Sequence, residues 1–158
     1  MGNQCSGGLK NSEQCVKSDL TALLCQVVAE DSIGYTTAYR VSSVRLHAIK
    51  RGMSQVRSAC ENWPQILHMG MLTTKPSHVS VCEIAEYIGY NLQNVFKIGH
   101  VMALCTYVTD FCVIKMCKNE LIDVYATMDS LVSFLVDKNL DMCVEFLKHL
   151  DSWPLMEM

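Results

Sequence analysis

Residues 94 to 117 read NVFKIGHVMALCTYVTDFCVIKMC, and this stretch decides the fold that we expect. Apolar side chains fall on nearly every side of a helix drawn through it, as is typical of a helix in the middle of a protein. Lys97, His100, Asp110 and Lys115 interrupt it, whereas a membrane span needs about 20 nearly uninterrupted apolar residues. The stretch therefore predicts a buried core helix.

The composition of the whole chain favours a single all-α domain. Of 158 residues, 50% are hydrophobic and 18% are charged, which excludes disorder over most of the length. Only 8 Gly and 3 Pro are present, too few for the many tight turns of a β-sandwich or barrel. The net charge of −3 and the absence of a dense basic run argue against nucleic acid as a partner.

Amphipathic segments lie on both sides of the central stretch. One apolar stripe predicts a helix over about 18–31, and a second helix over about 38–60 carries the main concentration of basic residues, which we interpret as a solvated face. Ser80 and Glu83 form a capping box that opens a helix to about residue 90. We expect about seven helices around a hydrophobic hairpin made by about 94–117 and about 120–137. The helical domain spans 13–158 and follows a flexible leader at 1–12.

Catalytic and metal-binding motifs are absent from the sequence. The 9 cysteines include no CxxC pair and follow no secretory signal, so we interpret them as small buried hydrophobes in a reducing compartment. GxSxG, GxGxxG, P-loop and HExxH patterns do not occur. We expect no enzyme activity, no cofactor and no metal.

The two chain ends bear on membrane attachment. Met1-Gly2-Asn3-Gln4-Cys5-Ser6 fits the myristoylation pattern at Gly2, and a palmitoyl chain on Cys5 could follow. The alternative is that the match is chance within a flexible Gly/Ser-containing leader. Residues 153–158 include no hydrophobic tail, so we expect no C-terminal anchor and membrane association only through acylation.

Three local patterns carry a family resemblance. Residues 97–104 read KIGHVMAL, which is similar to an N-W-G-R-V-V-A-L motif, with Gly99, Ala103 and Leu104 identical. Residues 146–153 read FLKHLDSW, similar to W-I-x-x-x-G-G-W, and a Gly-Tyr pair stands at 34–35. The chain resembles the Bcl-2 apoptosis regulators, particularly short virus-encoded members. It departs from their pattern at Lys97, Ile98 and His100, and at Asp151-Ser152 in place of Gly-Gly.

The resemblance implies a Bcl-2-like bundle with a surface groove that binds the amphipathic death-ligand helix of pro-apoptotic relatives. Gly99 would allow close approach of the ligand, and His100 would replace the family's arginine as a weaker donor to the ligand's aspartate. The predicted groove residues are Ile49, Met53, Val56, Leu92, Asn94, Lys97, Gly99, His100, Met102, Ala103 and Tyr107. Most of them could equally be ordinary core or helix-start residues. Phe146 and Trp153 are expected to pack the last helix, with Trp153 closing the groove.

An inhibitor of apoptosis is preferred over a pro-apoptotic member because no Leu-x-x-x-Gly-Asp occurs. Gly52 is followed by Met53 instead, and Ala48 stands four residues before it. The cysteines and the missing secretory signal indicate an intracellular protein, and with the resemblance we expect it in the host cell cytoplasm. A homodimer is left open. The alternative is a module of the same fold that modulates host signalling through another surface.

Overall fold

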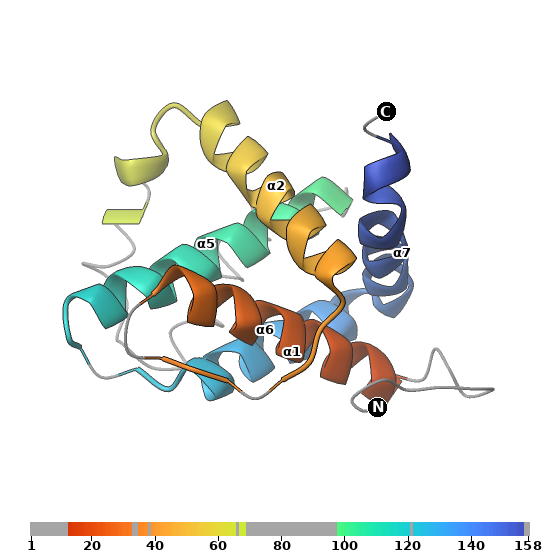
Figure 1. Cartoon of the computed structure of the whole chain (residues 1–158), viewed down its shortest axis with the longest axis horizontal. Coiled ribbons are helices and arrows are strands. Elements are labelled where there is room, and N and C mark those ends of the chain that lie inside the picture. Colours follow the sequence, from red (N-terminus) through yellow and green to blue (C-terminus); the bar gives the residue numbers. More distant parts are fainter. Residues whose placement is uncertain are drawn as a thin grey trace.

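The structure, a computed structural model, describes residues 13–32, 35–37, 39–65, 67–68, 98–120 and 122–156, with side chains described up to Ser152. Its elements are the helices α1 (Glu13–Asp31), α2 (Ser43–Ala59), α5 (Ile98–Cys117), α6 (Val124–Lys138) and α7 (Leu140–Met156) (Figure 1). Residues 63–65, 67 and 68 are also helical. Because these residues include no strand, the all-α prediction is confirmed for the part of the chain that the structure describes.

The first two helices are those that the apolar stripes predict, with shifted starts. α1 begins at Glu13, five residues before the predicted start, and buries Leu20, Leu23, Leu24, Val27 and Val28. α2 begins at Ser43 rather than near residue 38. The reason is a cap: the Ser42 hydroxyl accepts a hydrogen bond from the backbone N–H of Arg45 at 3.3 Å, and Ser42 itself has extended backbone angles.

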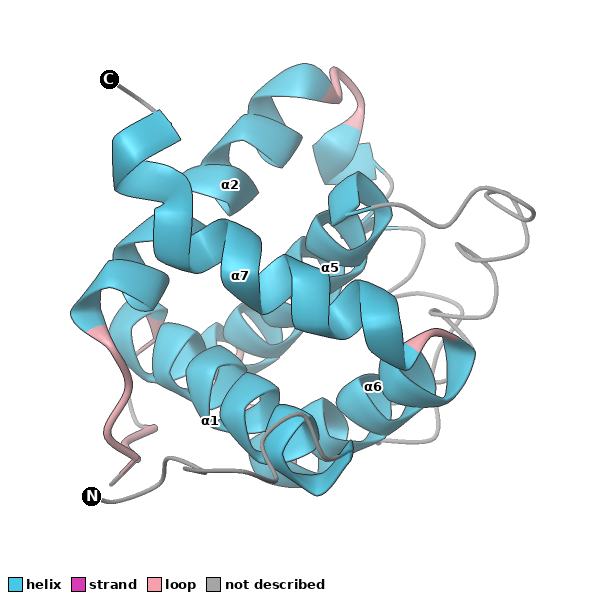
Figure 2. Cartoon of the chain, turned by 90° about the vertical axis from the view of Figure 1, so that its right-hand side faces the viewer, coloured by secondary structure: helices cyan, strands magenta, loops and turns pink. Residues whose placement is uncertain are grey.

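α5 is the central helix. It packs against α1, α2, α6 and α7, while Figure 2 shows α7 running across the face of the bundle. Residues on every side of α5 are buried, including Val101, Leu104, Val108 and Phe111. The helix is long and apolar enough to cross a membrane by length and composition, but 61% of its most apolar window is buried inside the structure. The prediction of a buried core helix is confirmed.

The end of α5 has a definite stop signal. Asn119 has a φ of 59°, in the left-handed region. The N–H of Glu120 donates to the carbonyl of Lys115 at 3.0 Å, and the N–H of Asn119 donates to that of Met116 at 3.0 Å. This pair of bonds is the Schellman motif, which satisfies the last carbonyls of a helix and turns the chain back.

α6 follows after a short connection and begins at a second cap, where Asp123 accepts from the N–H of Ala126 at 2.9 Å. The helix packs against α5, but it packs chiefly against α1. The predicted pairing of α5 with α6 is therefore present, within a layer that α1 completes.

Two basic residues of α2 form ion pairs with neighbouring helices, whereas the sequence predicted a solvated face. Arg45 contacts Asp151 of α7 at 2.7 Å and Asp19 of α1 at 3.7 Å. Lys50 contacts Glu30 at 3.0 Å on the last turn of α1. The hydrogen bonds that the Arg45 guanidinium donates to the Asp151 carboxylate are the main reason why the pKa of Arg45 is raised. These ion pairs join α2 to its neighbours, while Arg40 and Arg51 are exposed and the Lys50 side chain is 37% exposed, so the predicted solvated face is present in part. Sequence spacing alone does not locate the ion-pair partners.

Most of the described cysteines fit the prediction of small buried residues. Cys25, Cys105, Cys112 and Cys143 are buried free thiols. Burial raises the pKa of Cys25 and Cys143 to about 11 and that of Cys112 to about 12. Such thiols are poor nucleophiles near neutral pH. Three others depart from the prediction: Cys15 is disulfide-bonded, Cys117 is exposed and Cys60 is half-buried.

Several predictions fall outside the described residues. They are the leader at 1–12 with Gly2 and Cys5, the glycine of the Gly-Tyr pair at 34, the capping box at Ser80 and Glu83, and the last residues of the chain. They remain predictions.

Candidate functional site

The predicted groove residues of α2 and the middle of α5 lie together, and they are buried. Ile49 and Met53 of α2 share one core cluster with Met102 of α5. Met102 is 5% exposed and Tyr107 is 4% exposed, while Ile49 and Met53 are almost fully covered. The sequence therefore identified a real contact face between α2 and α5. In this structure these four side chains pack in the interior and do not line an open surface.

The accessible members of the predicted set lie at the start of α5 and near the end of α2. Gly99 is exposed, while His100, Ala103 and Val56 are half-buried. Among the described atoms, none lies within 4 Å of the position that a Cβ would take at Gly99. Gly99 and Ala103 are four residues apart, so they share a face of α5. Leu92, Asn94 and Lys97 lie outside the described residues.

Gly52 is a residue of this face that the sequence did not assign to it. A Cβ built on Gly52 would collide with the thioether end of Met102. The absence of a side chain thus lets α2 cross closely over α5. The sequence signal was present, since a glycine inside an amphipathic helix usually has a packing reason.

Tyr107 belongs to a second, smaller cluster of buried side chains. The Trp63 ring meets the Tyr107 ring edge to face, with centroids 6.0 Å apart and planes at 79°. Leu67 and Phe111 complete the buried group. Trp63 and Leu67 therefore cover the α5 surface at Tyr107, and Trp63 is a contributor that the sequence did not reveal.

Asp110 links this cluster to α2. Its carboxylate accepts two hydrogen bonds from the Arg57 guanidinium, at 2.8 and 2.9 Å, and one from the Trp63 indole at 2.9 Å. A half-buried carboxylate in an apolar helix needs hydrogen-bond donors. The charged residue Asp110 within the apolar stretch 94–117 was therefore the sequence signal that such donors lie nearby. A second carboxylate, Asp151, stands where the resembling motif has Gly and is bound by Arg45.

Phe146 is fully buried in the main core, where it packs α7 against the bundle. Trp153 belongs to α7, but its side chain lies outside the described part. Within the described residues, no group of three or more His, Cys, Asp or Glu side chains is placed to hold a metal ion. No protein-family model matches the chain, and comparison with curated proteins finds no match either.

Proposed function

We propose that the chain is a Bcl-2-like bundle of about seven helices that inhibits apoptosis by sequestering the death-ligand helix of pro-apoptotic relatives. The observation that carries the proposal is that, among the described atoms outside the backbone of α5, none lies within 4 Å of the Cβ position at Gly99, at the start of the central helix. A motif glycine with such space in the described part can admit the backbone of another helix. The activity is binding in the cytoplasm of the host cell, with no catalysis and no cofactor.

The accessible part of α5 has the chemistry that a helix-binding surface needs. Gly99 and Ala103 offer small residues on one face, where a ligand helix can come close. His100, next to Gly99, supplies a nitrogen donor for an acidic ligand residue, although a single imidazole donor is weaker than the fork of an arginine. We expect selectivity for a few ligands, because the polar contact is weak.

Calorimetric titration of the full chain against a panel of death-ligand peptides tests this function. At least one peptide should bind in the low-micromolar range or more tightly. Gly99→Glu should abolish binding by filling the open space with a charged side chain. Gly99→Ala is the matched control for folding, since a methyl group meets no described atom there. If no peptide binds better than its scrambled version, the proposed function is wrong.

A second candidate is a module of the same fold that modulates host signalling through another surface. The burial of Ile49, Met53, Met102 and Tyr107 favours it, because these side chains could bind a ligand only after α2, Trp63 and Leu67 moved. A folded, helical protein that binds none of the peptides would support this candidate over the first.

A further inference from the structure

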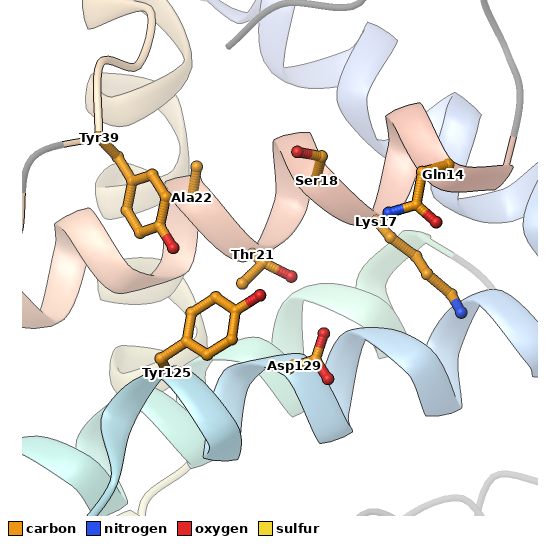
Figure 3. Close-up of a pocket in the computed structure, with 8 residues that line it drawn as sticks. All are labelled: Gln14, Lys17, Ser18, Thr21, Ala22, Tyr39, Tyr125 and Asp129. Atoms are coloured by element: carbon orange, nitrogen blue, oxygen red, sulfur yellow. The ribbon is translucent and has the colours of Figure 1, made fainter.

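A small hollow lies between α1 and α6, away from the α2 and α5 face. Its volume is about 90 Å³. Figure 3 shows that Tyr39 and Tyr125 reach into the space from the connection before α2 and from α6, while the carboxylate of Asp129 points toward α1. The lining residues are Gln14, Lys17, Ser18, Thr21, Ala22, Tyr39, Tyr125 and Asp129.

The hollow combines aromatic rings with a carboxylate. Tyr125 is 50% exposed and is one of the two large hydrophobic side chains that are exposed in the described part. Asp129 follows it by four residues, so both side chains are on one face of α6. Burial is the main cause of the raised pKa of Tyr39, and the negative field of Asp129 adds to it. The space is therefore lined by two phenol rings, the carboxylate of Asp129 and the ammonium group of Lys17.

Asp129 differs from the carboxylates that hold the bundle together. Asp19, Asp110 and Asp151 each contact an arginine of α2, whereas no described Lys, Arg or His lies within ion-pair distance of Asp129. The cation in the lining, Lys17, contacts Glu13 of its own helix at 3.5 Å. Asp129 is exposed to solvent, and its carboxylate has no ion-pair partner among the described side chains.

We propose that this hollow binds the guanidinium group of an arginine side chain presented by a partner polypeptide. A guanidinium is planar, so it can lie on the Tyr125 ring while its N–H groups donate to Asp129. The volume has room for several groups of the size of a water molecule and none for a large ligand. The proposal does not depend on the death-ligand groove, because no residue of α2 or α5 contributes to it.

The test is a titration of the isotope-labelled full chain, followed by backbone amide NMR, with N-acetyl-arginine amide. N-acetyl-citrulline amide is the matched neutral probe, since it has the same shape without the charge. We expect saturable shifts of the amides around residues 14–22 and 125–129, with dissociation constants in the millimolar range for this isolated side chain. Equal shifts with the citrulline probe, or no saturable shift, would overturn the proposal.

Substitutions identify the groups involved. Asp129→Asn should weaken arginine binding by about tenfold, and Tyr125→Leu by several-fold, because one removes the charge and the other the ring face. Lys17→Met should strengthen binding, since it removes a competing cation. Asp137→Asn, an exposed position further along α6, is the matched control and should leave binding unchanged. Binding that is unaffected by Asp129→Asn would show that the hollow is not the site.

Discussion

Arg57 of α2 and Asp110 of α5 form an ion pair in which both carboxylate oxygens accept a guanidinium N–H, at 2.8 and 2.9 Å. The Trp63 indole donates to the same carboxylate. Asp110 is 16% exposed and Arg57 is 35% exposed, so the pair is shielded from water only in part. The Asp110 side chain thereby joins both the end of α2 and Trp63 to the central helix.

Asp110→Ala should destabilise the protein. The substitution leaves the guanidinium of Arg57 and the buried side of the Trp63 indole without their acceptor. We expect the free energy of unfolding to fall by about 2 kcal/mol. Urea unfolding followed by far-UV circular dichroism measures this change.

Glu145→Ala provides the control for the Asp110 measurement. Glu145 pairs with Lys148 at 4.0 Å on the surface of α7, with 60% of its side chain exposed. Its removal should change the stability by less than about 0.5 kcal/mol. Equal losses for the two variants would mean that the Asp110 contacts are no stronger than a surface ion pair.

The fold class could be predicted from the sequence because hydrophobic periodicity reports local burial. The apolar stripe of α1 and the uniformly apolar α5 both correspond to observed helices, and the α5 prediction ends at the observed residue, Cys117. Helix starts were less accurate. Ser42 caps the N-terminus of α2 and Asp123 caps that of α6, and neither cap was used to predict where these helices begin.

The tertiary contacts could not be predicted in the same way. The partners of Arg45 and Arg57 are 106 and 53 residues away along the chain, a separation that no local pattern encodes. Periodicity also does not separate a groove wall from a core residue, since both are apolar and at helical spacing. For this reason Met102 and Tyr107 were predicted as groove residues and are found buried.

The glycines of α2 and α5 should respond in opposite ways to alanine. Gly99→Ala should leave the stability unchanged or raise it by up to about 1 kcal/mol, because alanine favours the helix and has space there. Gly52→Ala should cost about 1–2 kcal/mol, because the new methyl group displaces the end of Met102.

A double-mutant cycle separates the clash at Gly52 from other effects. In a Met102→Ala background the cost of Gly52→Ala should largely disappear, since the colliding thioether is absent. Chemical denaturation of the four proteins gives the coupling energy. An unchanged cost of Gly52→Ala in that background would contradict the close approach of α2 and α5.

The buried thiols predict a loss of stability at alkaline pH. Burial raises the pKa of Cys112 to about 12, whereas an unfolded cysteine has a pKa of about 8.5. Between these values the folded protein keeps a proton that the unfolded chain has lost. The free energy of unfolding should therefore fall with rising pH above about 9, by up to about 1.4 kcal/mol per pH unit for each such thiol.

Cysteine variants test the origin of that slope. Cys112→Ala should lower the stability at every pH through the small cavity that it leaves, but its decline between pH 9 and 10.5 should be shallower than that of the parent chain. Cys117→Ala removes an exposed thiol and should keep the parent slope. Parallel curves for all three proteins would show that Cys112 does not contribute.

The turn after α5 gives the sharpest prediction about the backbone. Asn119 has a φ of 59°, which glycine adopts without strain and β-branched residues adopt only at a cost. Asn119→Gly should leave the stability within about 1 kcal/mol of the parent, whereas Asn119→Val should lower it by about 1–2 kcal/mol. Thermal and urea unfolding of both variants measure the difference. Equal stability of Asn119→Val and Asn119→Gly would mean that the left-handed turn at residue 119 does not form in solution. The hydrogen bond from the N–H of Glu120 to the carbonyl of Lys115 depends on that turn.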